Sequence, residues 1–422
     1  MAESEQVVDS RLTPVRRWLA APDDGEPVMP PISFSVGDRQ LAGILGEWSC
    51  ETAVELVAAD ERSRTTVTYR DLQSGLVARC EVVEYADFPA IEWTPHFRND
   101  GGSDSPILAE IQALDLTFER KGDPEFLLHH ATGSPALASD YEPKETRLRP
   151  RSETRITTKG GRPSDTDLPY FNLEYDGGGV IVALGWPGQW GAQFSRDAEK
   201  SLRIRGGQEQ THFTLHPGEE VRGPLIALLG YEGDWIEGQN VWRRWMIAHN
   251  LPKIKGMPPA PFISAGSSNQ TNEMDDANEE NQNLFIDRYL EKNIPLDYYW
   301  MDAGWYVTAS GHWYDTGTWE VDRKRFPSGL RAVTDHAHAK GLKCVVWFEP
   351  ERLAPGSWLA ENHPEWLITL PGYRWTLLDL GNPEAWRWVV ERFDALIRSE
   401  GVDLYRQDFN VAPLDYWRSR DA

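Results

Sequence analysis

The chain has 422 residues, of which 40% are hydrophobic and 26% charged, a composition typical of globular proteins with about two or three domains. Its formal net charge of −23 disfavours binding to nucleic acids and to anionic membranes, because both are densely negative. No stretch reaches the ~18 consecutive apolar residues of a membrane span, and the N-terminus lacks the basic and apolar regions of a signal peptide.

The cysteine and tryptophan contents further restrict the kinds of protein that the sequence can encode. Cys50, Cys80 and Cys344 are too few and too widely spaced for a disulfide framework or a structural zinc site, so we expect a cytoplasmic protein without a metal centre. The 19 tryptophans are unusual. A tryptophan ring can stack on the apolar face of a sugar, although we expect most of the 19 in the core.

The first half of the chain has the pattern of a β-rich domain. Residues 1–30 show no clear periodicity, and we expect a loosely ordered N-terminal segment there. Within 31–234, apolar and polar residues alternate over stretches such as 76–82, and runs rich in Gly, Asp and Pro separate these stretches. Many short strands divided by turns predict a β-sandwich domain over 31–234.

A change of pattern marks the predicted domain boundary. Residues 235–249 place Trp242 and Trp245 at helical spacing, and residues 251–261 are rich in proline. We therefore expect a helical and proline-rich linker over 235–261.

Residues 262–422 alternate between strand-like and helix-like segments. An apolar stripe follows Asn382-Pro383, which is a typical helix start. Repeated β/α units imply a parallel sheet, either doubly wound or in a barrel. The expected strands are 262–265, 297–301, 343–348 and 403–406.

Polar side chains follow each of these four strands. Because active sites of parallel β/α folds form at the carboxyl ends of the strands, these side chains should converge. Any one carboxylate could be a helix cap or a salt-bridge partner, but three in succession among tryptophans indicate a site. The residues are Ser267–Gln270, Asp302, Glu349 and Glu351, and Asp408 and Asn410.

Carboxylates with aromatic residues suit glycoside hydrolysis, which needs one carboxylate as nucleophile or base and one carboxylic acid. Arg406 lies two residues before Asp408, so the two side chains share one face of a strand. A neighbouring cation keeps a carboxylate ionised, as a nucleophile requires, although a plain salt bridge is the simpler interpretation. On chemistry alone, Glu349 is a candidate acid.

Several motifs occur in an order that resembles glycoside hydrolase family 36, the α-galactosidases. In the second half these are Trp300–Trp305, Trp347–Glu351 and Arg406–Asp408. In the first half, Ala90–Trp93, Asn99, Ile111–Asp115 and Gly185–Trp190 resemble the β-supersandwich domain of that family. The resemblance covers about residue 30 to the end and implies a β-supersandwich followed by a (β/α)8 barrel.

The family resemblance also implies an activity: removal of terminal α-galactose from sugars of the melibiose and raffinose type, without a cofactor. The mechanism would be retaining, with Asp408 as the nucleophile that forms a covalent glycosyl-enzyme. The residues that the resemblance implies for sugar binding are Asp302, Trp305, Trp347, Glu349, Arg406 and Asn410. The expected partner is a small carbohydrate, and a homo-oligomer is compatible with the sequence.

Two departures from the family pattern affect these expectations. Ala303 replaces the second Asp of the family's Asp-Asp-Gly-Trp motif, which leaves open an α-N-acetylgalactosaminidase or a galactosyl-transferring enzyme. The acid/base Asp of the family follows the sixth barrel strand, whereas only four strands are expected in 262–422. We therefore expect a C-terminally truncated half barrel, for which a non-catalytic carbohydrate-binding fragment is a further alternative.

Overall fold

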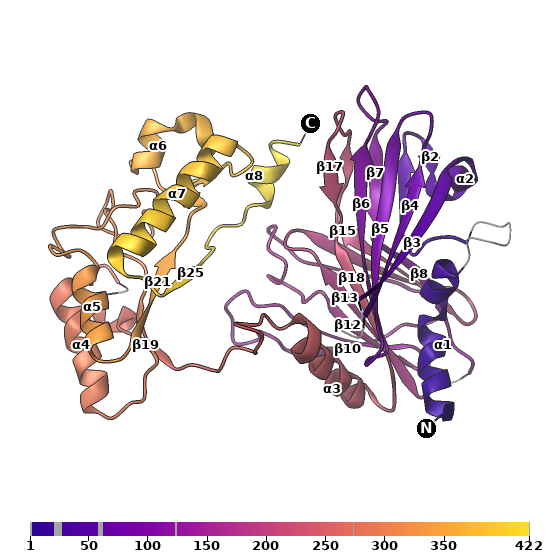
Figure 1. Cartoon of the computed structure of the whole chain (residues 1–422), viewed down its shortest axis with the longest axis horizontal. Helices are drawn as coiled ribbons and strands as arrows, with labels where there is room; N and C mark the ends of the chain where they lie inside the picture. Colours follow the sequence, from indigo (N-terminus) through magenta and orange to yellow (C-terminus); the bar gives the residue numbers. More distant parts are fainter. Residues whose placement is uncertain (1, 21–27, 58–61, 123–124, 273, 422) are drawn as a thin grey trace. The chain divides into compact units, whose positions relative to one another are not determined.

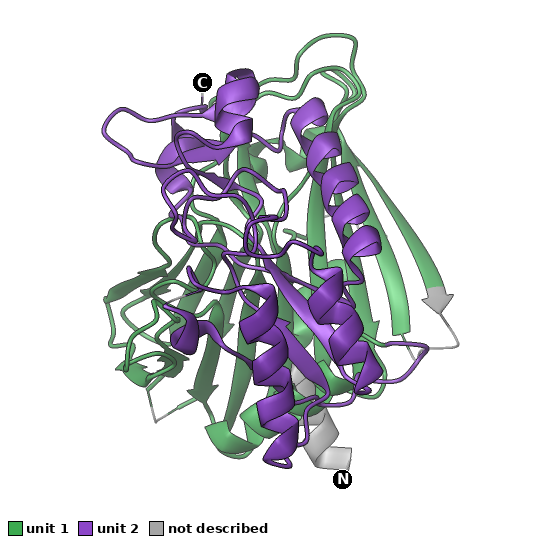
Figure 2. Cartoon of the chain, turned by 90° about the vertical axis from the view of Figure 1, so that its left-hand side faces the viewer, with its two compact units in different colours: residues 1–253, 422 green, residues 254–421 purple. Residues whose placement is uncertain are grey.

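The structure is a computed structural model that describes residues 2–20, 28–57, 62–122, 125–272 and 274–421 (Figure 1). The chain forms two compact units, one up to Lys253 and the other over Ile254–Asp421 (Figure 2). None of the helices in these described ranges is long and apolar enough to cross a membrane.

The first unit is built from antiparallel sheets. The largest has ten strands in the order β10-β9-β12-β13-β18-β6-β5-β4-β3, with β17 paired to β6. Its strands are β3 (Ser49–Val57), β4 (Arg62–Arg70), β5 (Leu76–Tyr85), β6 (Ala90–Asn99), β9 (Leu127–Ala131), β10 (Pro143–Arg147), β12 (Tyr170–Tyr175), β13 (Gly178–Gly185), β17 (Glu220–Arg222) and β18 (Leu225–Glu232).

Two four-stranded sheets complete this unit, in the orders β11-β14-β15-β8 and β16-β7-β1-β2. Their strands are β1 (Ser33–Val36), β2 (Arg39–Gln40), β7 (Leu108–Gln112), β8 (Leu114–Glu119), β11 (Glu153–Thr157), β14 (Trp190–Arg196), β15 (Ser201–Gln208) and β16 (His212–Phe213), and the short helices α2 (Leu41–Ile44) and η1 (Leu45–Glu47) follow β2. Alternate residues of β5, from Leu76 to Val82, are buried, so the period of two is confirmed there.

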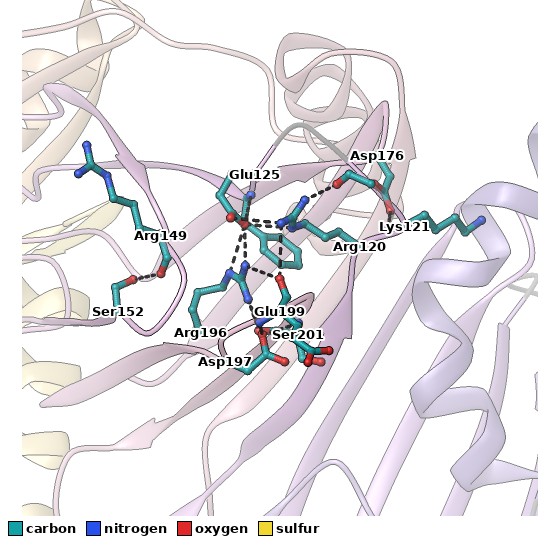
Figure 3. A network of polar contacts seen from close by, with 12 residues as sticks. Arg120, Lys121, Glu125, Arg149, Ser152, Asp176, Arg196, Asp197, Glu199 and Ser201 are labelled. Atoms are coloured by element: carbon teal, nitrogen blue, oxygen red, sulfur yellow. Dashed lines mark hydrogen bonds and ion pairs between the residues drawn. The ribbon is translucent and has the colours of Figure 1, made fainter.

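A charged network stabilises one end of the first unit (Figure 3). The Arg196 side chain is fully buried and donates to Glu125 Oε1 at 2.9 Å and to the Ser201 carbonyl at 2.6 Å. Its guanidinium also lies 5.2 Å from the centre of the Phe126 ring. Because Arg120 reaches the same Glu125 carboxylate, two cations share one acceptor and join three chain segments.

The N-terminal segment differs from the prediction. Within residues 1–30, which we expected to be loosely ordered, the structure has the helix α1 (Ala2–Leu19). Leu12, Val15 and Trp18 are buried, and Trp18 Nε1 donates to the Tyr69 hydroxyl at 2.7 Å. These residues repeat every third position, so one apolar stripe docks on the sandwich. The segment 21–27 lies outside the described residues.

The region predicted as a linker over 235–261 divides between the two units. Helix α3 (Trp235–Trp245) begins at Asp234, whose side chain accepts from the Glu237 amide, and it continues into η2 (Met246–Asn250). Trp245 is buried against Tyr85 of the large sheet. Residues 235–250 therefore cover the sandwich and belong to its unit, and the division between units follows at Lys253.

The second unit contains a four-stranded parallel sheet in the order β19-β20-β21-β25. Its strands are β19 (Ser264–Gly266), β20 (Tyr298–Met301), β21 (Lys343–Phe348) and β25 (Leu404–Gln407), and helices α4 (Glu279–Glu291), α5 (Arg331–Ala339) and α7 (Pro383–Glu400) alternate with them. The remaining elements are η3 (Ser268–Thr271), β22 (Arg352–Leu353), α6 (Trp358–Asn362), η4 (Pro364–Trp366), β23 (Leu367–Ile368), β24 (Thr376–Leu378) and α8 (Leu414–Arg418). Consecutive parallel strands with intervening helices match the predicted first half of a (β/α)8 barrel, and the predicted fold class is confirmed.

Local signals explain where the long helices begin and end. Asn278 and Asn281 form a capping box at the start of α4. Asn382 caps α7, Pro383 occupies its first turn, and Gly401 ends it with a φ of 68°. Phe393 of α7 packs on Phe348 of β21 at a ring distance of 4.8 Å, so the helix covers one face of the sheet.

The docking of α1 yields a stability prediction. Trp18→Ala removes a buried indole and its hydrogen bond, and we expect it to lower the free energy of unfolding of the first unit by about 3–5 kcal/mol. Arg17→Ala, on the exposed side of the same helix, should change it by less than about 0.5 kcal/mol. Urea denaturation measures both; equal stability of the two variants would contradict the docking of α1.

Candidate active site

The parallel sheet has one face covered by helices and one face that carries the polar candidates. Tyr299 donates from its hydroxyl to Gln282 of α4 at 2.9 Å, and Phe348 packs on α7, which identifies the helix-covered face. Because side chains alternate along a strand, Trp300, Trp347 and Arg406 point to the opposite face. Trp347 is paired with Arg406 in the register of β21 and β25.

Asp408 lies just past the carboxyl end of β25 and accepts several hydrogen bonds. Its Oδ2 accepts from Trp347 Nε1 at 2.9 Å and from Asn410 Nδ2 at 3.0 Å, and lies 3.2 Å from the Arg406 guanidinium. Its Oδ1 accepts from the Phe409 backbone N–H at 2.9 Å. Its own N–H donates to the Phe348 carbonyl at 2.8 Å, which continues the pairing of β21 and β25.

These donors determine the charge of Asp408. Burial of the carboxyl raises its pKa, but the hydrogen bonds from Trp347, Asn410 and the Phe409 amide, with the charge of Arg406, outweigh burial and lower the pKa to about 2. Each donor stabilises the ionised form, so the group is a carboxylate at neutral pH. It can act as a nucleophile or a base, but it has no proton to give.

Arg406 is held between this carboxylate and an aromatic ring. Its guanidinium lies 4.9 Å from the centre of the Trp300 ring, a cation–π distance, and about one third of its side chain is exposed. The predicted sharing of one strand face by Arg406 and Asp408 is seen in their 3.2 Å contact. Ring stacking fixes the guanidinium plane and leaves part of it accessible to a ligand.

Glu349 has a different position from the one expected of a proton donor or sugar ligand. It is 0% exposed, and its two oxygens accept from Arg352 Nε at 2.9 Å and Nη2 at 2.5 Å. Oε1 also accepts from the Asn410 backbone N–H at 2.5 Å. The carboxylate therefore acts as an acceptor for internal donors, and it presents no free oxygen to a sugar.

Two tryptophans expected at a sugar surface are buried in the second unit. Trp305 and Trp347 are each 1% exposed, and Trp347 stacks on Tyr306 with ring centres 6.0 Å apart. Trp305 donates from Nε1 to the Trp347 carbonyl at 2.9 Å, and Trp347 in turn donates to Asp408. Trp347 thus reaches Asp408 through its N–H group and Trp305 supports the Trp347 backbone, whereas the faces of both rings pack in the core.

Asp302 lies at the same edge, after β20. Its Oδ2 accepts from the Ser268 hydroxyl at 3.0 Å and its Oδ1 from the Ala303 N–H at 2.9 Å. Ala303 is buried among apolar side chains, so this position offers a methyl group where the family motif has a carboxylate. In the described part of the chain, no cluster of three or more His, Cys, Asp or Glu residues could hold a metal ion.

Sequence reasoning missed Arg352 and the rings around it. Its guanidinium lies 5.4 Å from the centre of the Trp313 ring and 5.0 Å from that of Trp375, and it donates to the Tyr314 carbonyl at 2.9 Å. The available signal was its spacing of three residues from Glu349. The aromatic partners come from separate loops, which no local pattern brings together.

Glu351 is the other carboxylate of its motif, and among the described residues no hydrogen bond or ion pair joins it to Asp408. Burial and the nearby charge of Glu349 raise its pKa, as a proton donor needs. Its charge acts on Tyr405, whose ring packs on Phe348 and Phe393 on the helix-covered face. Glu351 therefore acts electrostatically on Tyr405 and makes no described direct contact with Asp408.

Comparisons with known proteins point to one family. The family model described as Melibiase matches residues 273–417. The α-galactosidase Mel36A of Lactobacillus acidophilus is 23% identical over 397 residues, which cover 91% of this chain and 52% of that protein. The chain thus spans about half the length of this curated relative.

Solved structures with the same fold are α-galactosidases of glycoside hydrolase family 36. A variant of AgaA from Geobacillus stearothermophilus, in complex with 1-deoxygalactonojirimycin, has a TM-score of 0.74 at 16% identity, covering 92% of this chain and 56% of that one. Another AgaA variant, in complex with raffinose, has a TM-score of 0.73 at 15% identity, covering 91% and 56%. These similarities show that the fold is shared.

The low pKa of Asp408 predicts a pH dependence of stability. A carboxyl with a lowered pKa in the folded state contributes stability above its unfolded pKa of about 4, and this contribution is lost as the pH falls through about 2. The full contribution is about 2 kcal/mol, of which about 1 kcal/mol is lost by pH 3.

Asp408→Asn should remove this dependence. Between pH 6 and pH 3, the wild-type second unit should lose about 1 kcal/mol more stability than the variant, as measured by urea midpoints at both pH values. Asp394→Asn, on the exposed side of α7, serves as the control. Equal losses in the wild type and Asp408→Asn would contradict the low pKa.

Proposed function

We propose that the chain belongs to glycoside hydrolase family 36, that its barrel unit carries the nucleophile of a retaining α-galactosidase, and that this nucleophile is Asp408. The observation that carries the proposal is the ionised Asp408 carboxylate, which lies at the carboxyl end of a parallel strand and has three hydrogen-bond donors and the charge of Arg406 beside it. A nucleophilic carboxylate must be charged and fixed in direction, and these contacts meet both requirements.

In this mechanism a carboxylate oxygen of Asp408 attacks the anomeric carbon of a terminal α-galactose. A new C–O bond forms, the bond to the leaving group breaks, and its electron pair departs with that group. Water then attacks the anomeric carbon of the β-linked galactosyl-enzyme. The bond to Asp408 breaks, its electron pair returns to the carboxylate, a water proton passes to solvent, and the product has the α configuration. Of the two oxygens, Oδ1 accepts a single described hydrogen bond and Oδ2 accepts two with Arg406 also near, so Oδ1 has more free electron density for the attack.

Arg406, Asp302 and Asn410 are proposed to hold the sugar hydroxyls. Arg406 and Asn410 adjoin the nucleophile and are at least partly exposed, and Asp302 lies at the carboxyl end of β20 in the same sheet. Trp305, Trp347 and Glu349 are proposed to act from within the protein, because their side chains are buried. Galacto-oligosaccharides of the raffinose type are the proposed substrates, consistent with the raffinose bound to the AgaA variant.

Asp408→Asn tests the assignment directly. With 2,4-dinitrophenyl α-galactoside, whose leaving group needs no proton, the wild-type chain should form a covalent galactosyl adduct on the peptide that contains Asp408. The variant should form no adduct and release dinitrophenol at least about 10³-fold more slowly, because an amide is a poor nucleophile. Rapid quench and mass spectrometry measure both quantities.

Asp394→Asn is again the matched control, since it removes a carboxylate of the same unit that pairs with Arg398 on a helix surface. It should retain the adduct at the wild-type rate. An adduct on a different carboxylate, or undiminished turnover by Asp408→Asn, would contradict the proposal.

The leaving group should control the rate of the first step. Melibiose needs protonation of its departing oxygen, and such general acid assistance is worth roughly 10²–10⁴ in rate. Among the described side chains in contact with Asp408 none is a carboxylic acid, and Glu349 is ion-paired. This chain should therefore consume melibiose at least about 10²-fold more slowly than the dinitrophenyl galactoside, measured by released galactose. Comparable rates would show that a described residue supplies the proton.

A further inference from the structure

We infer that the buried Glu349–Arg352 pair is a positioning unit for Asp408 and acts on it through Asn410. The inference rests on the proposed function, because it gives the pair a task only if the direction and charge of Asp408 matter. It deepens that function by assigning a role to two residues that touch neither the nucleophile nor a sugar.

The pair is rigid and isolated from water. The Arg352 side chain is 3% exposed and that of Glu349 is 0% exposed, and the two groups meet in a two-pronged contact through Nε and Nη2. The third nitrogen, Nη1, donates to the Tyr314 carbonyl, and the rings of Trp313 and Trp375 lie near the guanidinium. Such contacts leave the Glu349 carboxylate one orientation.

Asn410 transmits this orientation to the nucleophile. Glu349 Oε1 accepts from the Asn410 backbone N–H at 2.5 Å, and Oε2 accepts from its Nδ2 at 3.3 Å. The same Nδ2 donates to Asp408 Oδ2 at 3.0 Å. An amide nitrogen has two hydrogens, so one is directed to each carboxylate. With the amide reversed, its oxygen would face both negative groups, which fixes the side chain in the observed orientation.

Stability alone does not explain why this position carries charged residues. A buried ion pair has to recover the cost of removing two charges from water, and apolar residues of similar size are often as stabilising. The charged pair does what apolar residues cannot: it accepts two hydrogen bonds from Asn410 and thereby fixes the donor that faces Asp408. Asn410 itself is exposed and would otherwise be free to turn to solvent.

The test replaces both charges at once. Removing Glu349 alone would also remove a negative charge near Asp408, which lowers the pKa of Asp408 and obscures the result. In Glu349→Gln/Arg352→Met the charge of the pair stays zero, so the remaining effect is the loss of Asn410 positioning. Glu349→Asp is the second variant, because it keeps the charge but withdraws the carboxylate by one methylene group.

Two readouts are used on the full chain. The first is the carboxyl ¹³C NMR signal of Asp408, assigned by its loss in Asp408→Asn, followed against pH. In the wild type it should stay at the ionised position to the lowest pH at which the fold persists, since the pKa is about 2. In each variant the titration of Asp408 should move up by about one pH unit, because the hydrogen bond from Asn410 to the ionised Asp408 carboxylate is weakened.

The second readout is the rate of galactosyl adduct formation from the dinitrophenyl galactoside. We expect a fall of about 10- to 100-fold in each variant, with the acid side of its pH profile moved upward like the titration. A structural role alone would lower the unfolding midpoint and leave both the titration and the pH profile in place.

The matched control is Glu125→Gln/Arg196→Met, which removes a buried Arg–Glu pair in the other unit (Figure 3). It should lower the free energy of unfolding and leave the titration of Asp408 and the rate of adduct formation unchanged. If the variants at Glu349 fold and both readouts match the wild type, the inference is overturned. If the titration shifts but the wild type forms no adduct, the positioning unit stands and the proposed activity fails.

Discussion

The second unit depends on one electrostatic requirement: a carboxylate must remain ionised at the end of a parallel strand. Asp408 meets it by accepting from donors on three sides, and each donor is itself fixed. Trp347 is buried and accepts from Trp305 through its carbonyl, and Arg406 lies over Trp300. Trp347 shows how a tryptophan serves this requirement, because its indole N–H reaches a carboxylate while its ring fills the core.

The same requirement separates the roles of the carboxylates. Two acidic groups near one another ionise independently only if each has its own positive or hydrogen-bonding partner. Arg406 and Trp347 serve Asp408, whereas Arg352 serves Glu349. Asn410 is shared and links the two. The arrangement gives each carboxylate its own partner and leaves Asp408, the partly exposed one, available to a substrate.

Much of the fold could be predicted from sequence because it follows local periodicity. The period of two over 76–82 and the strand expected over 343–348 correspond to β5 and β21, and the Asn382-Pro383 helix start corresponds to α7. The shared strand face of Arg406 and Asp408 follows from the same period. In contrast, α1 was missed because its apolar stripe is short and Pro14 lies within the helix.

The rest of the site depends on contacts between loops. Trp305 and Trp313 follow β20 and Trp375 follows β23, and whether their rings face a ligand or the core is decided by packing. The sequence indicated that Glu349 belonged to the site, but the ion pair with Arg352 determines what it can do there. Spacing in sequence can place a charged group at a sheet edge, but it does not identify its partner.

Chemical rescue of the missing nucleophile tests the central claim most directly. In Asp408→Gly, azide can occupy the space of the carboxylate and attack the dinitrophenyl α-galactoside from the same side. The account predicts β-galactosyl azide, identified by the anomeric coupling in its proton NMR spectrum, and no reaction without azide. Release of dinitrophenol by the variant without azide, or formation of α-galactosyl azide, would contradict the assignment of Asp408 as the nucleophile.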